Sequence, residues 1–128
     1  MWLGIDIGTG GSRALVVDES GVVRGSRTAV HEDMKMERPL WAEQRPENWW
    51  DAAKDAIRGA LADARVAGER IRGIGLSGQM HGLVILDAGG SVIRPALIWC
   101  DQRSQAQVDG VNASWAAKTS CATSPTPC

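Results

Sequence analysis

The sequence predicts an α/β domain built on a mixed sheet, and three observations predict it. Apolar segments over residues 3–7 and 14–17 flank a glycine-rich turn, which is typical of a β-hairpin. An amphipathic segment between Pro46 and Gly68 predicts a helix. Another apolar segment, residues 71–77, follows that helix. Because a helical crossover returns the chain parallel to its preceding strand, we expect an antiparallel three-strand meander extended by one parallel strand.

The turn of the first hairpin has the composition of an anion-binding loop. Its three glycines lack a Cβ atom, so successive backbone N–H groups can converge on one phosphate. Two hydroxyl groups and a permanently charged guanidinium add further donors. The residues are Gly8, Thr9, Gly10, Gly11, Ser12 and Arg13. Neither the G-x-G-x-x-G spacing nor a P-loop Gly-Lys-Ser/Thr is present, so the prediction depends on this turn alone.

Asp6 lies in the first predicted strand between Ile5 and Ile7. A carboxylate beside a bound phosphate would repel it unless a cation lay between them, so Asp6 is predicted to hold Mg²⁺ or its water shell. A structural interpretation, in which the glycines form an ordinary hairpin tip and Asp6 caps a turn, stays open at this point.

The meander continues through a turn at residues 18–21 and a strand from Val22 to about Val30. The aperiodic segment 31–39 is predicted to be a loop. His31 has no cysteine or carboxylate pair at ligand spacing, so we expect it at the surface.

The predicted helix begins near Pro46, which suits a first helical turn, and ends before Gly68. Its apolar residues recur at helical spacing and predict one face packed on the sheet. That face comprises Trp50, Ala53, Ile57, Ala60, Leu61 and Ala64. We expect the Trp49–Trp50 pair to be its buried anchor, since no basic groove accompanies it.

The parallel strand leads into Gly78, Gln79, Met80, His81 and Gly82. In open α/β sheets ligands bind beyond the carboxyl ends of the strands, where the glycine turn would also lie. Gln79 and His81 could hydrogen-bond hydroxyl groups of a polar ligand, and Met80 could pack against its carbon face. A structural role for His81 stays open.

The later chain predicts strands over residues 83–86 and 96–100, with a turn at 87–90 between them. A helix could begin at Asp101, but its periodicity fades. From residue 110 onward the chain contains one branched aliphatic residue and many Ser, Thr, Ala and Pro. We therefore expect residues 110–128 to be a disordered or frame-shifted tail, and residues 1–109 to form the domain.

Composition excludes several classes of function. The net charge of −1 over 128 residues gives no basic field for nucleic acid or an anionic membrane. Three cysteines without C-x-x-C spacing argue against a disulfide framework or a zinc site. No basic leader and no apolar run of about 20 residues occur, so a cytoplasmic protein is expected.

Taken together, the motifs closely resemble the N-terminal part of the FGGY carbohydrate kinases, with the xylulokinases as the nearest branch. The resemblance covers about residues 2 to 109. The motifs are Asp6-x-Gly8-Thr9-Gly10-Gly11-Ser12-Arg13, Trp41 with Glu43-Gln44 and Trp49-Trp50, Gly78-Gln79-Met80-His81-Gly82, and Trp99-x-Asp101-x-Arg103.

This resemblance implies a ribonuclease-H-like, actin-like ATPase fold of two domains that binds ATP and Mg²⁺ in a cleft. It implies that Asp6 lies near the metal and phosphates as the catalytic acidic residue, and that residues 8–13 bind the phosphates. Met80 and His81 match the pair that contacts a ketopentose such as D-xylulose, beside Gln79. Trp99 and Asp101 resemble residues that line the sugar pocket.

The family's catalytic aspartate and most of its adenine site lie downstream of these 128 residues. We therefore expect negligible kinase activity from this fragment alone, because phosphoryl transfer needs an oriented nucleophile and charge neutralisation together. A truncated or frame-shifted gene would explain the tail, and sequencing the locus would test that.

Two other classes of function stay open. One is a non-catalytic sugar- or phosphate-binding module. The other is a ribonuclease-H-like nuclease, which would need further carboxylates near Asp6. For full-length relatives the resemblance also leaves a homodimer open.

Overall fold

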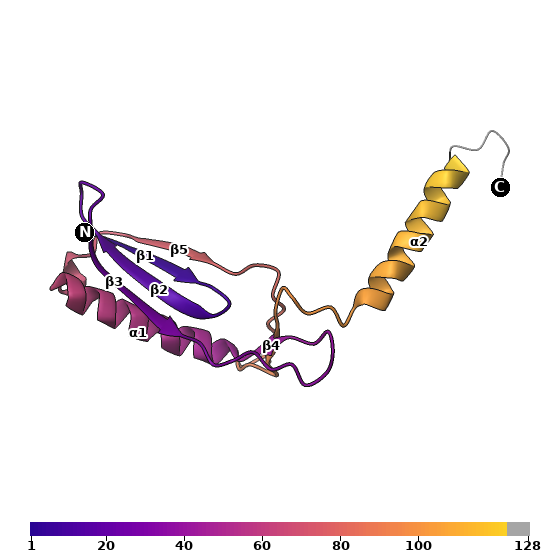
Figure 1. The fold of residues 1–128 in the computed structure, drawn as a ribbon, viewed down its shortest axis with the longest axis horizontal. Coiled ribbons are helices and arrows are strands. Elements are labelled where there is room, and N and C mark those ends of the chain that lie inside the picture. Colours follow the sequence, from indigo (N-terminus) through magenta and orange to yellow (C-terminus); the bar gives the residue numbers. More distant parts are fainter. Residues whose placement is uncertain (123–128) are drawn as a thin grey trace.

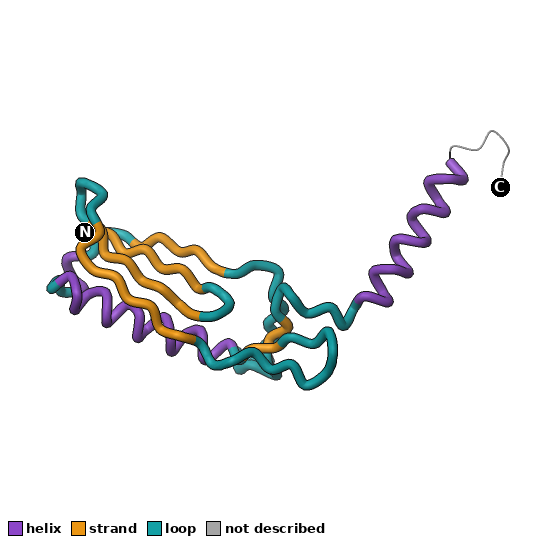
Figure 2. The backbone as a smooth tube through the Cα atoms, viewed as in Figure 1, coloured by secondary structure: helices purple, strands orange, loops and turns teal. Residues whose placement is uncertain are grey.

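The computed structural model describes residues 1–122, which form a four-stranded sheet with one helix on one face and a second helix beyond it (Figures 1 and 2). The sheet has the order β3-β2-β1-β5. Its strands are β1 (Trp2–Ile7), β2 (Gly11–Val17), β3 (Val23–Val30) and β5 (Ile74–Gly78). A second sheet pairs β4 (Glu43–Gln44) with β6 (Ala96–Leu97), and the helices are α1 (Pro46–Ala64), the 3₁₀ turn Gly68–Arg70 and α2 (Gln105–Ala122).

The strand directions confirm the predicted mixed sheet. Strand β2 pairs antiparallel with both β1 and β3, whereas β5 pairs parallel with β1. The parallel register joins Leu3 to Ile74 and Ile7 to Gly78. The glycine turn after β1 and the loop after β5 therefore leave the sheet at the same edge, as the crossover argument requires.

The core lies between the sheet and α1. Its buried members are Leu3, Ala14, Val16, Ala56 and Ala60. The helical alanines are four positions apart and so share one face of α1. At Gly25 on β3, an added Cβ atom would lie 2.3 Å from the carbonyl oxygen of Ala60. The helix backbone therefore lies so close to β3 that only glycine fits there.

The predicted buried anchor of the helix is only partly present, because Trp49 is half-buried and its Nε1 donates to Gln44, whereas Trp50 is exposed. Trp50 is 62% exposed, and its ring lies 5.8 Å from the Nζ atom of Lys54. Small side chains fill the interface with the sheet, and the gap between Gly25 and Ala60 does not admit a large ring at that end of the helix. The buried helical residues are Ala52, Ala53, Ala56 and Ala60.

The strands predicted after β5 are shorter than expected. Only Ala96–Leu97 forms a ladder, as β6. Residues 83–86 contribute two isolated bridges, from Leu83 to Leu97 and from Leu86 to Val92. The turn at 87–90 forms as predicted, because Asp87 Oδ1 accepts hydrogen bonds from the backbone N–H groups of Gly89 and Ser91 at 2.8 Å.

Helix α2 covers most of the segment predicted to be a disordered tail. Its backbone is helical from Gln105 to Ala122, which differs from the expected disorder over residues 110–122, and it projects away from the sheet (Figure 1). Residues 123–128 lie outside the described residues. The domain boundary at residue 109 and the frame shift stay predictions. Within residues 1–122, no helix is long and apolar enough to cross a membrane.

Candidate functional site

The glycine turn is closed by its own backbone. The N–H of Gly8 donates to the carbonyl oxygen of Gly11 at 3.0 Å. A Cβ atom at Gly11 would lie 2.8 Å from the carbonyl oxygen of Ala29, so glycine is required where β2 begins. Directly beside this turn, the N–H of Gln79 donates to the carbonyl oxygen of Ile7 at 2.7 Å. The two predicted half-sites are therefore neighbours.

Thr9 contacts two other predicted site residues, Gln79 and Trp99, each from a separate segment. Its hydroxyl donates to Oε1 of Gln79 at 3.4 Å and accepts a hydrogen bond from Nε1 of Trp99 at 2.9 Å. The tip of the first hairpin, the loop after β5 and the segment after β6 meet at this hydroxyl. A ligand that contacts any one of these side chains would lie beside the other two.

Met80 and His81 follow Gln79 in the loop after β5 and both face solvent. Met80 is 70% exposed. His81 is also exposed, and its φ of 63° is a left-handed conformation that non-glycine residues rarely adopt. Within residues 1–122, no side chain hydrogen-bonds to the His81 ring, so both residues are available to a ligand.

Asp6 and Arg13 are paired across the β1–β2 ladder on the sheet face opposite α1. They contribute to a hollow of about 350 Å³ whose other lining residues include Leu15, Leu76 and Ser77. Arg13 donates from Nε and Nη2 to the hydroxyl of Ser26 at 3.4 Å.

The donor set at the hairpin tip fits a phosphate. Among residues 1–122, none accepts a hydrogen bond from the backbone N–H of Thr9 or of Gly10. A Cβ atom at Gly10 would meet no atom within 4 Å, so the space beside the tip is open. Two unpaired amides in open space are what an anion-binding nest offers.

Asp6 is exposed, so its carboxylate is free to meet a hydrated Mg²⁺ ion. The described residues contain no cluster of three or more His, Cys, Asp or Glu side chains that could hold a metal. Asp6 would therefore supply one carboxylate, and the other oxygens would come from water and phosphate, which is the usual arrangement for Mg²⁺.

The structure places Ser12 away from the open tip. Its side chain is fully buried on the α1 side of the sheet, and its hydroxyl contacts Nε2 of His31 at 2.9 Å and the carbonyl oxygen of Trp49 at 3.5 Å. Alternation along β2 turns Ser12 inward and Arg13 outward. The role predicted for Ser12 in phosphate binding therefore has no support from its orientation.

The prediction that His31 lies at the surface is wrong. His31 is only 5% exposed, and its Nδ1 lies 3.3 Å from the carbonyl oxygen of Thr9. The residue follows β3 directly, and the pairing of Gly11 with Val30 brings it beneath the turn. Sequence spacing alone did not reveal this, because the partners are about twenty positions away.

Gln44 is a second buried polar residue to which the motifs assign no role. It is 7% exposed, and its Nε2 donates to the carbonyl oxygen of Thr9 at 2.7 Å. Its Oε1 accepts hydrogen bonds from Nε1 of Trp49 at 3.0 Å and from Nε2 of Gln79 at 3.3 Å. The available signal was a polar side chain directly before a predicted helix.

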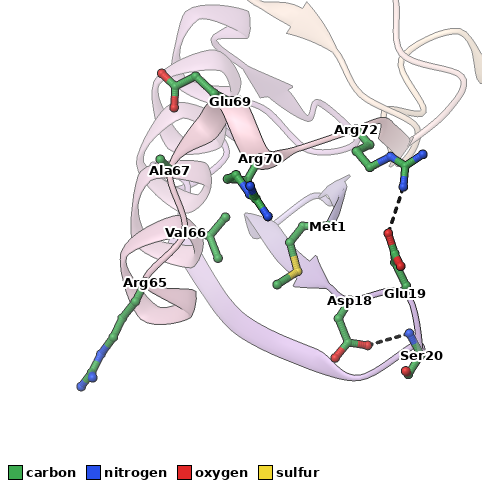
Figure 3. A pocket seen from close by; sticks show the side chains of 10 residues that line it. All are labelled: Met1, Asp18, Glu19, Ser20, Arg65, Val66, Ala67, Glu69, Arg70 and Arg72. Carbon is green, nitrogen blue, oxygen red and sulfur yellow. Dashed lines mark hydrogen bonds and ion pairs between the residues drawn. The ribbon is translucent and has the colours of Figure 1, made fainter.

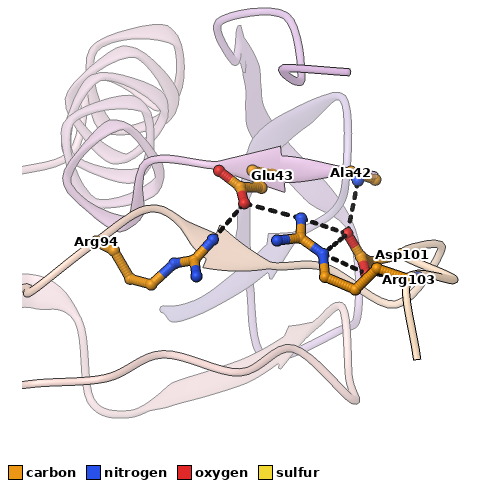
Figure 4. Close-up of polar contacts among 5 residues, drawn as sticks. All are labelled: Ala42, Glu43, Arg94, Asp101 and Arg103. Carbon is orange, nitrogen blue, oxygen red and sulfur yellow. Dashed lines mark hydrogen bonds and ion pairs between the residues drawn. The ribbon is translucent and has the colours of Figure 1, made fainter. Parts of the chain in front are cut away.

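Asp101 holds the neighbouring loop together (Figure 4). Its Oδ2 accepts hydrogen bonds from the N–H of Ala42 and from Nη2 of Arg103, both at 2.7 Å. Arg103 also pairs with Glu43 at 2.8 Å, and Arg94 pairs with the same Glu43 oxygen. Burial acts to raise the pKa of Asp101, but the hydrogen bonds from Arg103 and from the backbone hold that pKa below its ordinary value. Its carboxylate is therefore occupied within the protein.

Another hollow lies at the opposite end of the sheet (Figure 3). It has a volume of about 830 Å³ and lies between the β2–β3 turn and the connection from α1 to β5. Its rim carries charges of both signs, including an ion pair between Arg72 and Glu19 at 2.9 Å. None of the predicted site residues lines it, so it is separate from the candidate site.

Comparison with known proteins decides the family. A family model described as the FGGY family of carbohydrate kinases, N-terminal domain, matches residues 1–126. The chain belongs to the FGGY family of carbohydrate kinases. This confirms the resemblance seen in the motifs, and the match extends beyond residue 109.

Individual FGGY relatives agree with this assignment. The xylulose kinase of Klebsiella pneumoniae is 39% identical over 120 residues, which cover 89% of this chain and 24% of the relative. The xylulose kinase of Escherichia coli strain K12 is 41% identical over 105 residues, covering 80% and 21% respectively. The chain thus spans about a quarter of the length of these relatives.

Solved FGGY structures share the fold. A crystal structure titled as a xyloylose kinase from Brucella ovis has a TM-score of 0.82 and 39% identity, over 90% of this chain and 24% of that one. Plasmodium falciparum glycerol kinase with ADP has a TM-score of 0.72 and 25% identity, over 87% and 22%. The predicted fold class, an actin-like ATPase fold present here as a partial domain, is confirmed. The roles of individual residues stay predictions.

Proposed function

We propose that this chain is the N-terminal part of an ATP-dependent sugar kinase that phosphorylates a hydroxyl group of a ketopentose such as D-xylulose. The observation that carries the proposal is the meeting of the glycine turn, Gln79 and Trp99 at the Thr9 hydroxyl. Phosphoryl transfer requires donor and acceptor groups to be held side by side, and this junction joins the two predicted half-sites. The relatives named xylulose kinase support the choice of sugar.

On the phosphate side, the unpaired N–H groups of Thr9 and Gly10 would bind phosphate oxygens. Arg13 would contribute positive charge from the open face of the sheet, and Asp6 would hold Mg²⁺ through its water shell. When bound, ATP supplies the phosphoryl group and Mg²⁺ neutralises its charge. Gly8 and Gly11 keep the turn narrow, while Ser12 supports it from the buried side.

On the sugar side, the exposed Met80 and His81 would contact the ketose. Gln79 would reach the sugar from the base of the same loop, and Trp99 would cover it with an exposed indole ring. Asp101 supports this side from behind, because it fastens the segment that follows Trp99 to the backbone of Ala42.

The catalytic base expected from the family lies outside these 128 residues. We therefore expect no measurable turnover of D-xylulose by the chain alone, although it would bind ligands. A non-catalytic sugar- or phosphate-binding module is the second candidate, favoured by the unpaired backbone N–H groups of Thr9 and Gly10 beside open space. A nuclease is not favoured, because the described residues hold no cluster of metal-ligating side chains.

Intrinsic tryptophan fluorescence of the purified chain tests this proposal. We expect D-xylulose to give a saturable change, glycerol to give none, and Mg-ATP to give a separate saturable change. The variant Trp99→Phe should remove most of the xylulose response, whereas Trp50→Phe, on the exposed side of α1, should retain it. The absence of any xylulose response in a folded protein would contradict the sugar site.

A further inference from the structure

The hydrogen bonds around Thr9 form a closed ring. The Thr9 hydroxyl donates to Oε1 of Gln79, and Nε2 of Gln79 donates to Oε1 of Gln44. Nε2 of Gln44 then donates to the carbonyl oxygen of Thr9 at 2.7 Å. All three donors run in one direction around the ring, which is the arrangement in which neighbouring hydrogen bonds polarise and strengthen one another.

The ring fixes the direction in which one peptide unit points. The carbonyl oxygen of Thr9 and the N–H of Gly10 belong to the same planar peptide bond, and no cis peptide bond is present among the described residues. In a trans peptide these two groups point in opposite directions. Holding the Thr9 oxygen on the Gln44 side therefore aims the Gly10 N–H away from Gln44, toward the open space at the tip.

His31 secures the same turn from its other side. Its Nδ1 lies 3.3 Å from the Thr9 oxygen, and its backbone N–H donates to the carbonyl oxygen of Gly10 at 3.0 Å. A carbonyl oxygen can only accept, so Nδ1 carries the proton in this contact, while Nε2 lies 2.9 Å from the Ser12 hydroxyl. Two consecutive carbonyls of the turn are thus held within the protein.

We propose that Gln44 is a positioning residue that aims the Gly10 N–H at a bound phosphate and links the phosphate turn to the Gln79 loop. Only a side chain with both a donor and an acceptor can close the ring, because Thr9 offers a carbonyl oxygen and Gln79 offers an N–H. Glutamine meets this need without a charge, which matters at a position so deeply buried.

Two substitutions of Gln44 distinguish the role of its side-chain donor from that of its side-chain acceptor. Gln44→Glu keeps an acceptor for Trp49 and Gln79 but removes the donor to Thr9. Gln44→Met is close in size and uncharged, and it removes both functions without burying a carboxylate. Gln107→Glu is the matched control, because Gln107 is exposed on α2 and the substitution makes the same change in charge.

The first measurement uses the ligand-free chain and NMR. In both Gln44 variants we expect the Thr9 carbonyl resonance to move upfield and the residual dipolar coupling of the Gly10 N–H to change. Because that coupling reports the direction of the N–H bond, a purely stabilising role of Gln44 would not alter it in a folded protein. Gln107→Glu should leave both signals unchanged.

The second measurement adds Mg-ATP and follows the Gly10 amide resonance. We expect each Gln44 variant to bind roughly three- to tenfold more weakly than the unaltered chain, which corresponds to losing one oriented hydrogen bond. Gln107→Glu should bind as the unaltered chain does. Only this measurement rests on the proposed function.

The two measurements distinguish failure of one proposal from failure of the other. If the Gly10 coupling and the Thr9 carbonyl resonance stay unchanged in folded Gln44→Met, Gln44 does not position the turn. If both change while the unaltered chain shows no binding of Mg-ATP, positioning stands and the proposed phosphate site fails. If Gln44→Glu does not fold, Gln44→Met decides the question alone.

Discussion

The two long helices of this chain are nearly equal in length and opposite in environment. Helix α1 has 19 residues and packs along β1, β2 and β3. Helix α2 has 18 residues and, within the described chain, has no comparable contact with any strand or helix. Figure 1 shows α1 lying along the sheet and α2 pointing away from it.

The difference lies in how small and apolar residues are distributed. Helix α1 gathers its alanines on one face, opposite the Gly25 gap in β3. In α2 the apolar side chains are spread around the helix, and Val108, Val111 and Trp115 are all exposed. Helix propensity alone gives marginal stability in water, so the tertiary packing of one face is what distinguishes α1 from α2.

The largest effect on stability should come from filling the space at Gly25 that lets α1 lie close to β3. Gly25→Val places a branched side chain where even a Cβ atom would lie 2.3 Å from the Ala60 oxygen and 2.6 Å from the Ala64 nitrogen. We expect the free energy of unfolding to fall by about 3 kcal/mol or more. Urea denaturation followed by circular dichroism measures it.

Gly75→Val is the matched control for that change. Gly75 also lies in a strand, but a Cβ atom there would meet nothing within 4 Å. A control variant as unstable as Gly25→Val would mean that strand glycines, and not the approach of α1, set the cost.

The next largest effect should come from the segment that leads into α2. Asp101→Asn keeps an acceptor for the Ala42 N–H but loses the ion pair with Arg103. We expect a loss of about 2 kcal/mol in the free energy of unfolding, since charged hydrogen bonds at a buried carboxylate are broken. Asp109→Asn, on exposed α2, should cost far less, and equal losses at both positions would contradict a special role for Asp101.

The pH dependence of stability follows from the lowered pKa of Asp101. Because the pKa is lower in the folded state, the unfolded chain takes up a proton first as the pH falls. The contribution of Asp101 is therefore complete above about pH 5 and is lost as the pH drops through about 4 and below. Thermal melts across this range should show a steeper decline for the unaltered chain than for Asp101→Asn.

Replacing one glycine by alanine in each helix should give a smaller difference in stability between the two helices. Gly110→Ala should stabilise α2 by up to about 1 kcal/mol. The Cα chemical shifts of α2, measured by NMR, should then move further toward helical values. In α1, Gly59→Ala should gain less, because the new Cβ atom would lie 2.5 Å from Cγ of Arg27, whose guanidinium pairs with Asp63. Equal gains in both helices would show that the contact with Arg27 has no cost.

The smallest effect should come from removing α2 altogether. Ending the chain after residue 104 should change the free energy of unfolding of the sheet and α1 by less than about 0.5 kcal/mol, because among the described residues α2 packs on them far less than α1 packs on the strands. A larger loss, measured by urea denaturation, would mean that α2 contacts the sheet in solution.

The predictable parts of this fold are those in which local pattern and tertiary packing agree. The hairpin, the third strand, the helix from Pro46 and the parallel strand were all predicted from periodicity and turn residues, and the structure confirms them within a few positions. The stripe that includes Trp50 was predicted less well, because helical spacing alone does not show which positions of α1 meet the sheet.

The exposed residues of the candidate site could be predicted from the sequence, but the buried residues that hydrogen-bond to them could not. Exposed residues such as Met80 were found from their place after a strand. The buried partners His31 and Gln44 were missed because their hydrogen bonds reach Thr9 across 22 and 35 positions. Asp101 was found as a motif residue, but its occupation by Arg103 and the Ala42 backbone depends on contacts that no local pattern contains.

Residues 94–103 hold the loop before α1 in place, and this has a consequence during synthesis. A chain leaves the ribosome from its N-terminus, so the first hairpin and α1 are free to associate before residues 94–103 emerge. The Gln102 N–H, which donates to the Leu40 carbonyl oxygen at 2.7 Å, is only then available. The pairing of Gln44 with Ala96 in the β4–β6 ladder also waits for this segment, so a nascent chain stalled before residue 94 would carry the main sheet without the second sheet.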